Sequence, residues 1–261
     1  MVDIVSIIIA VIAFVGSLGA AAIAGWITLS SDERKRLSEA EKLLNKYRDP
    51  LLLVAQDLQS RLYNITDQNL TSWINHPGDK RDNLLQYTCF LVGQFLAWTN
   101  ILRRESQFLR FATDKANKDF TTTLNAISYA FLTDGTGPLG FPFILWKGKQ
   151  LAIGEIMTVK EDDQHFCMGY SDFHVKWTED KEFQRWFHTL TDGITVIADA
   201  RVSGEDSVPD QRLRRIQHLL VCLIHLLDPK GLRSDATRTK QCIPAWECSC
   251  SVCLLTRQYG L

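Results

Sequence analysis

The sequence has no surplus of charge of either sign. Lys and Arg number 29 and Asp and Glu number 30 among the 261 residues, so the formal net charge is −1. Proteins that hold nucleic acid through its phosphates carry a basic patch or stripe, and no broad basic stretch occurs here. We therefore expect no nucleic-acid partner.

The familiar catalytic motifs are missing as well. The chain contains no Gly-Lys-Ser/Thr phosphate loop, no dinucleotide fingerprint, no HExxH and no GxSxG. The Gly-rich stretch "DGTGPLG" at 134–140 lacks the spacing and the Lys of a phosphate loop, and we interpret it as a plain loop. His218 and His225 are seven residues apart, whereas two metal ligands on one helix are usually four apart, so we expect core or boundary histidines. The sequence predicts no metal and no cofactor, and it names no reaction.

The cysteines do not form a disulfide framework, because their total of seven is odd. Four of them, Cys242, Cys248, Cys250 and Cys253, crowd the last twenty residues. A tetrathiolate zinc site and a redox pair of Cys250 and Cys253 are two interpretations. Lipidation of Cys248, Cys250 and Cys253 by reversible acylation is a third, and it is favoured because apolar residues lie beside them. A plain flexible tail over 233–261 is the remaining interpretation.

Charged residues are also absent from Ile4 to Leu29. As a helix these roughly 26 residues would measure about 39 Å, more than the roughly 30 Å hydrocarbon core of a bilayer. A cleaved signal peptide has a basic start and an apolar run of about 7–15 residues, whereas this chain starts Met-Val-Asp. We predict a transmembrane anchor over residues 1–30. The alternative is a signal peptide cleaved after Ala24. It is supported by the small residues "AIAG" at 22–25, which resemble a cleavage site.

The distribution of Lys and Arg around this run predicts the orientation. None precedes the run, and six follow it at Arg34, Lys35, Arg36, Lys42, Lys46 and Arg48. Positive residues stay on the cytosolic side of a membrane, so the body of the protein is expected to face the cytosol. If the run is instead a cleaved signal, the product is a secreted glycoprotein with sequons at Asn64 and Asn69.

Small residues recur every four positions within the predicted span, at Ala13, Ser17, Ala21 and Gly25. Such a stripe lets two helix backbones approach closely in lipid, which predicts a homo-oligomer formed through this helix. The alternative is that Gly and Ala are simply frequent in membrane spans.

The remaining chain has the apolar spacing of helices. We expect an amphipathic juxtamembrane helix over 31–48, a new helix starting at Asp49-Pro50 because Asp caps helices and Pro suits their first position, and a helical domain over 49–232. Leu84–Leu102 is apolar but contains three amides, and we predict a buried central helix rather than a second span. Further helices are expected around 120–131, 180–200 and 210–227.

A small β element is expected near 141–170. The stretch "FILWKGKQLAIGEIMTV" places apolar runs around a Lys-Gly-Lys turn, which suggests either a hairpin or a strand leading to a short helix. "HFCMGY" adds a possible strand. The predicted fold class is therefore mainly α: an N-terminal transmembrane helix, then a cytosolic helical bundle with a small β element.

Three stretches carry a resemblance: "RDPLLLVAQDLQSRLYN", "FLAWTNILRRESQFL" and "KGKQLAIGEIM". From about Leu37 to Leu232 the chain resembles a family of fungal and bacterial proteins that often begin with one N-terminal span. The resemblance implies a cytosolic helical domain behind an anchor. It transfers no activity and no catalytic residue.

Two classes of function fit these patterns. The first is an interaction or accessory domain at a membrane, whose partners are lipid and another protein. The second is an enzyme whose pocket is assembled from distant residues, for which the candidates are the aromatic, acidic and histidine side chains Trp146, Glu155, His165, Tyr170 and His174.

Overall fold

The computed structural model describes residues 4–76, 78–106, 115–132, 142–204 and 208–234. Within these ranges some side chains lie outside the description, chiefly those of residues 4–13 and several up to residue 45. The chain divides into two compact units, Met1–Lys46 and Tyr47–Leu261. The predicted mainly helical class with a small β element is confirmed. The helices and strands are α1 Ile4–Thr66, η1 Leu70–Asn75, α2 Asp79–Asp82, η2 Asn83–Tyr87, α3 Thr88–Ser106, α4 Lys115–Leu132, α5 Lys147–Ile156, β1 Thr158–Glu161, β2 Gln164–Cys167, α6 Tyr170–Glu179, α7 Lys181–Arg185, α8 His188–Val202 and α9 Gln211–Leu227.

The first unit consists of α1 up to Lys46. Among the residues that the structure describes, no helix is both long enough and apolar enough to cross a membrane. The transmembrane anchor over residues 1–30 stays a prediction.

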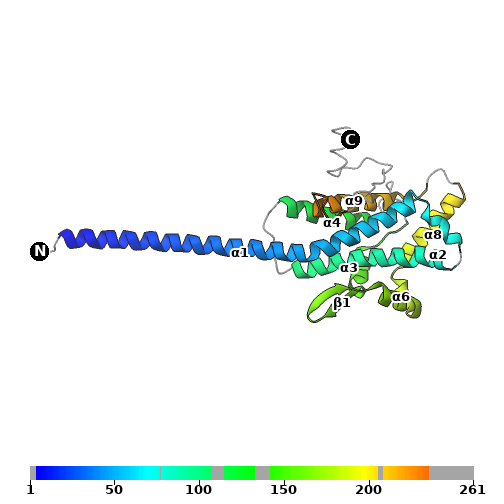
Figure 1. Ribbon diagram of the computed structural model, residues 1–261, viewed down its shortest axis with the longest axis horizontal. Coiled ribbons are helices and arrows are strands. Elements are labelled where there is room, and N and C mark those ends of the chain that lie inside the picture. Colours follow the sequence, from blue (N-terminus) through cyan, green and yellow to red (C-terminus); the bar gives the residue numbers. More distant parts are fainter. Residues whose placement is uncertain (1–3, 77, 107–114, 133–141, 205–207, 235–261) are drawn as a thin grey trace, which may run out of the picture. The chain divides into compact units, whose positions relative to one another are not determined.

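The second unit is a bundle built around α3. The neighbouring α5 packs against α3, and the antiparallel pair of β1 and β2 lies on it as well. On the opposite side of α3 and the second part of α1, α4 and α9 run side by side (Figure 1). Most residues of α3 up to Leu102 are buried, with Ile101 and Cys89 fully covered, whereas Arg104 near its end is exposed. The prediction of a buried central helix is confirmed.

Close helix contacts in this unit depend on glycine. A Cβ on Gly154 of α5 would lie 2.9 Å from the Leu96 carbonyl oxygen of α3. A Cβ on Gly193 of α8 would lie 2.7 Å from the Phe143 ring. These distances are shorter than van der Waals contact, so the absence of a side chain on glycine lets α5 cross α3 this closely and lets the Phe143 ring lie this close to α8.

The helix predicted to restart at Asp49-Pro50 does not do so. Pro50 lies inside α1, which continues unbroken to Thr66. Pro cannot donate the main-chain hydrogen bond to the residue four positions earlier. Burial compensates for this loss, because Tyr47 and Leu51 on either side of Pro50 are 4% and 2% exposed.

The Lys-Gly-Lys segment does not form the predicted hairpin turn. It is helical and begins α5. The apolar stretch before α5 has the composition of a strand, but its main-chain groups form hydrogen bonds with a side chain and with α4 and not with another strand. The buried Gln150 amide donates to the carbonyls of Leu145 at 2.8 Å and Ser128 at 2.9 Å. The main-chain N–H of Leu145 donates to Phe131 at the end of α4. The strands instead lie at 158–161 and 164–167, within the predicted range.

The helix expected over 180–200 is two helices. The carboxylate of Asp180 caps α7 by accepting from the N–H groups of Glu182 and Phe183. The helical hydrogen bonding then breaks at Trp186 and Phe187 before α8 begins. Phe187 is buried against Phe173, with ring centroids 5.5 Å apart, and this packing takes precedence over helix continuity.

Arginine side chains donate hydrogen bonds to the last carbonyls of several helices. The last carbonyls of a helix have no partner within the helix. Arg201 of α8 donates to Ile65 and Thr66 at the end of α1, both at 2.6 Å, and Arg214 of α9 donates to Thr66 at 3.1 Å. Asp210 is 2% exposed and accepts from both guanidinium groups. This cluster fixes the end of α1 against the end of α8 and the start of α9.

We predict that Leu58→Ala destabilises the protein by about 2–5 kcal/mol, because Leu58 is fully buried and the change leaves a cavity. Leu53→Ala is the matched control on the same helix, where the side chain is 59% exposed and the expected change is within about 0.5 kcal/mol. Urea unfolding followed by circular dichroism measures both. Equal losses for the two variants would contradict the packing described here.

A second prediction concerns Asp228, directly after α9. Its carboxylate accepts from the main-chain N–H groups of Arg233 at 2.8 Å, Ser234 at 2.7 Å and Leu232 at 3.0 Å. These bonds, that from Arg233 first, hold the pKa of Asp228 well below its ordinary value of 3.8. A lowered pKa in the folded state stabilises the protein above the ordinary pKa, and this contribution is lost as the pH falls below it.

We therefore expect the urea midpoints of the wild type and Asp228→Asn to differ by a constant amount from about pH 5 to pH 7 and to converge below about pH 4. Asp163→Asn in the exposed turn is the control, with little difference at any pH. A gap for Asp228→Asn that stays constant down to pH 2.5 would argue against the role of these hydrogen bonds.

Candidate functional site

The five residues proposed from sequence as pocket residues do not come together. Trp146 precedes α5 and is 53% exposed, whereas Glu155 lies at the far end of this helix, about 13 Å away at 1.5 Å per residue. His165 and Glu155 lie near the end of α3, where they contact Glu105 at 3.2 Å and Arg104 at 3.0 Å.

Tyr170 and His174 belong to a separate group on α6. Tyr170 packs edge-on against Phe90 of α3, with ring centroids 5.1 Å apart. The imidazole Nδ1 of His174 lies 2.7 Å from the amide nitrogen of Gln86. These contacts hold α6 against the central helix, and they do not enclose a pocket.

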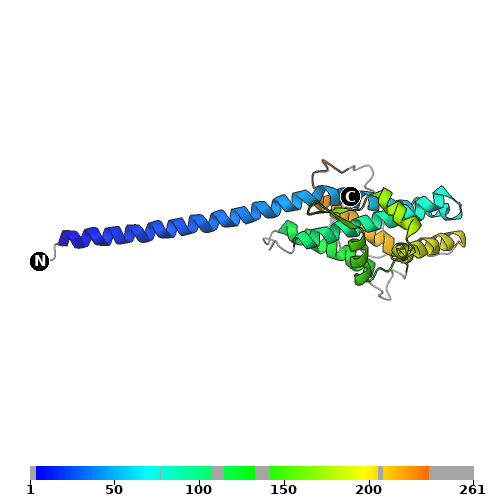
Figure 2. The same cartoon turned by 90° about the horizontal axis from the view of Figure 1, so that it is seen from below.

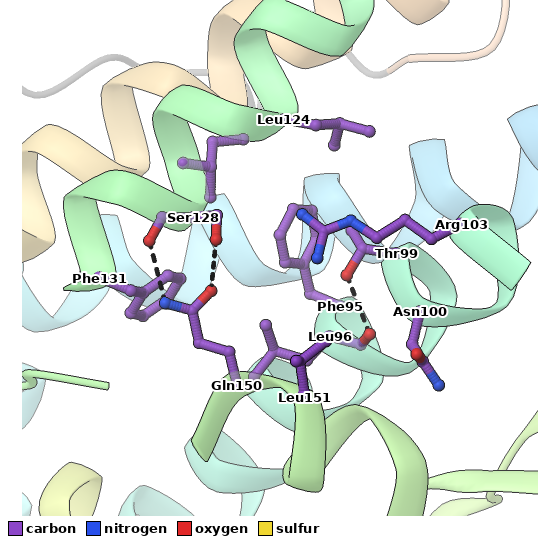
Figure 3. Close-up of a pocket in the computed structure, with 11 residues that line it drawn as sticks. Phe95, Leu96, Thr99, Asn100, Arg103, Leu124, Ser128, Phe131, Gln150 and Leu151 are labelled. Carbon is purple, nitrogen blue, oxygen red and sulfur yellow. Dashed lines mark hydrogen bonds between the residues drawn. The ribbon is translucent and has the colours of Figure 1, made fainter. Parts of the chain in front are cut away.

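An enclosed cavity does occur between α3, α4 and α5 (Figure 3). Its volume is about 20 Å³, which is room for about one water molecule. Gln150 and Ser128 face each other across hydrogen bonds of 2.6 and 2.9 Å at its wall. The cavity is too small for a substrate, although the buried amide nitrogen of Asn100 in its lining has no hydrogen-bond partner among the described residues.

The irregular element of the central helix is a more promising place. Between α2 and α3 the backbone forms a five-residue π-helix, η2. The hydroxyl of Thr88 donates to the Leu84 carbonyl at 2.5 Å, which places a side chain in the helical hydrogen-bond ladder. Short π-helical segments inside α-helices frequently mark functional sites. Two grooves flank η2.

The first groove lies between α2 and η2 on one side and α6 to α8 on the other. α2 and α8 lie at the same end of this unit (Figures 1 and 2). The groove has a volume of about 520 Å³, in the usual range for ligand sites. Its walls carry both charge signs, through Arg81 on one hand and Asp82 and Asp192 on the other, and Gln86 and His188 add polar groups.

The second groove lies on the other side of η2 and has a volume of about 270 Å³. One wall is a face of α1 with Asp57, Ser60, Arg61 and Asn64. The opposite wall combines η1, η2 and α3, which contribute Leu70, Trp73, Asn83, Tyr87 and Leu91.

Arg61 dominates the electrostatics of this second groove. Its guanidinium carbon lies 4.7 Å from the centre of the Tyr87 ring, a cation–π contact. One of its N–H groups donates to the Asn83 amide oxygen at 3.3 Å. Burial lowers the pKa of Arg61 from its ordinary value, partly offset by Tyr87 and Tyr170. Among the described residues, no carboxylate forms an ion pair with it.

The pKa of Tyr87 is shifted by the same groove residues. Burial raises the pKa of its hydroxyl, the negative charge of Asp57 raises it further, and the positive charge of Arg61 lowers it. The ring is held by Phe90 and Tyr170, at centroid distances of 6.1 and 5.5 Å. The groove therefore has a positively charged group and an aromatic ring that are both fixed in place.

Other chemistry is limited in the described part of the chain. No group of three or more His, Cys, Asp or Glu side chains there could hold a metal ion. Burial raises the pKa of the Cys89 thiol, and it raises that of Cys167 to about 12. Both thiols stay protonated near neutral pH and are poor nucleophiles. His218 is 1% exposed, while His225 is exposed, so they do not share a site.

Several predicted residues fall outside the description. Cys242, Cys248, Cys250 and Cys253 lie in 235–261, and the side chains of Ala13 and Ala21 are not described. Ser17 donates to the Phe14 carbonyl at 2.8 Å, and no atom outside the helix backbone approaches a Cβ position of Gly25. Lipidation of the tail and pairing through the small residues stay predictions.

Comparison of the chain with protein-family models, with curated proteins and with solved structures finds no match. The resemblance noted from the sequence stays a prediction for the same reason.

Sequence reasoning missed both grooves. Their walls combine the segment from η1 to α3 with α1 in one groove and with α6 to α8 in the other, and α6 to α8 lie far from that segment along the chain. A π-helix also has no distinctive composition. One signal was present in hindsight: Asp57 and Arg61 are four residues apart among the apolar residues of a predicted helix, so they share its polar face.

We predict that Asp57→Asn lowers the pKa of Tyr87 and that Arg61→Gln raises it. The reason is that the first change removes a negative charge near the hydroxyl and the second removes a positive one. Titration of the ¹³Cζ signal of Tyr87 in labelled protein measures both shifts. Tyr129, which is 64% exposed, is the control in each variant. Shifts of the same sign in the two variants would contradict the arrangement of this groove.

Proposed function

We propose that the protein is a single-pass, membrane-anchored interaction or accessory protein whose body faces the cytosol. The observation that carries this proposal is the run from Ile4 to Leu29, which contains no charged residue. A stretch of about 20 predominantly apolar residues is enough to span the hydrocarbon core as a helix.

The side chains described within this run support the same proposal. Phe14, Ile23, Trp26, Ile27 and Leu29 are all more than half exposed. A row of large apolar side chains open to water is unfavourable by about 25 cal/mol per Å². Lipid around the helix would remove this cost, and Trp26 near the charged flank suits a membrane interface.

The orientation rests on the residues that follow. Arg34 and Lys35 begin a basic flank, and the short N-terminal flank has no Lys or Arg. Retention of positive residues in the cytosol then places the bundle there.

An interaction role for the bundle is favoured over catalysis by the grooves themselves. They are open, and their walls combine charged, polar and aromatic side chains. Open grooves with mixed polar and aromatic walls suit binding instead, to a protein or a small molecule.

We expect the full chain to stay in the membrane fraction after carbonate extraction, and added protease to digest its body in sealed microsomes. Ala13→Asp with Ala20→Asp is the matched control, because each Asp near the centre of a span costs about 2.5–3.5 kcal/mol. That variant should be released by carbonate. A protected body would reverse the orientation, and a mature N-terminus at Gly25 would establish the secreted alternative.

A further inference from the structure

Arg61 differs from the other partly buried arginines of the bundle in what it contacts. Arg214 forms ion pairs with Asp210 at 2.9 Å and Asp67 at 3.1 Å, and Arg212 donates to main-chain carbonyls. Arg61 has the Tyr87 ring and one long hydrogen bond to a neutral amide. Withdrawing a guanidinium from water is costly unless a partner compensates it, so Arg61 retains binding capacity towards the groove.

The neighbours of Arg61 are suited to an anion. A guanidinium has five N–H donors in a planar fork that matches a carboxylate or a phosphate. Ser60, Asn64 and Asn83 line the same groove and offer further donors. On the opposite wall, Leu70, Trp73 and Leu91 form an apolar surface.

We propose that this second groove is a binding site for a small organic oxyanion, with the charged group on Arg61 and an apolar or aromatic body against Trp73. The carboxylate can belong to a free organic acid, and a phosphate ester of similar size offers the same chemistry. This site does not depend on the membrane anchor, so a result against either proposal leaves the other unaffected.

Asp57 sets a limit on the ligand. Its carboxylate lies on the same face of α1, one turn before Arg61, and its charge reaches Tyr87. A second negative charge on the ligand would be repelled. The groove therefore favours a monoanion such as a carboxylate over a dianionic phosphate.

The experiment uses the full chain in detergent micelles with ¹⁵N-labelled tryptophan, and it follows the indole signal of Trp73, assigned with Trp73→Phe. The probes are benzoate, its neutral analogue benzamide, and inorganic phosphate. We expect benzoate to shift the Trp73 signal in a saturable way, benzamide to have no effect, and phosphate to bind more weakly than benzoate.

Arg61→Gln should weaken benzoate binding about 10- to 100-fold, the usual range for a hydrogen-bonded charge. Arg104→Gln is the matched control, because Arg104 is an exposed arginine paired with Glu155, and it should bind as the wild type does. Asp57→Asn leaves Arg61 intact and should tighten benzoate binding, because it removes a repulsive charge. This variant keeps the test decisive if Arg61→Gln folds poorly.

Equal binding of benzoate and benzamide would overturn the proposal, since the groove would then recognise only the ring. Benzoate binding that is unchanged in Arg61→Gln, or weakened in Asp57→Asn, would overturn it as well. Phosphate binding as tight as that of benzoate would overturn the preference for a monoanion with an apolar body.

Discussion

The bundle depends on arginine side chains that donate to the main-chain carbonyls at helix ends. Arg201 and Arg214 reach Ile65 and Thr66 of α1 across about 130 to 150 residues of sequence. Asp210 holds the two guanidinium groups beside each other, and Asp67, which pairs with Arg214, supplies the second negative charge that balances them. Because the chain turns into η1 directly after this point, the cluster also sets where Trp73 lies relative to Arg61, and so it builds the second groove.

The same device recurs elsewhere in the bundle. Arg212 is 1% exposed and donates to Ala130 near the end of α4 and to Pro142 after it, and Arg48 donates to Leu227 at the end of α9. Arginine suits this role because it stays charged and is weakly hydrated, and because positive charge is favourable at a helix C-terminus. Leaving any one of these guanidinium groups without its carbonyls would cost more than the bond itself contributes.

Periodicity alone predicted the helices whose packing follows their own apolar stripe. α4 and α9 lie where the spacing of Ile127 and Phe131, and of Leu213 and Leu220, placed them. The errors arose where side-chain contacts decide the backbone: the packing of Tyr47 near Pro50, the Gln150 amide that donates to the segment before α5, and the Thr88 hydroxyl that donates to a carbonyl of the π-helix. The grooves could not be predicted, because no local pattern shows which distant helices will face each other.

The contrast between the two kinds of arginine bears on function. Where stability is the requirement, as at Arg212 and Arg214, the guanidinium is saturated by carbonyls or carboxylates. At Arg61 the surroundings give an aromatic face and a neutral amide, although Asp57 lies only one turn away on the same helix. An i,i+4 ion pair between them would stabilise the helix by only about 0.3–0.5 kcal/mol. Contact with Tyr87 and one hydrogen bond to Asn83 instead leave most of the N–H donors of this groove-lining guanidinium without an acceptor among the described residues, which is what binding an external anion requires.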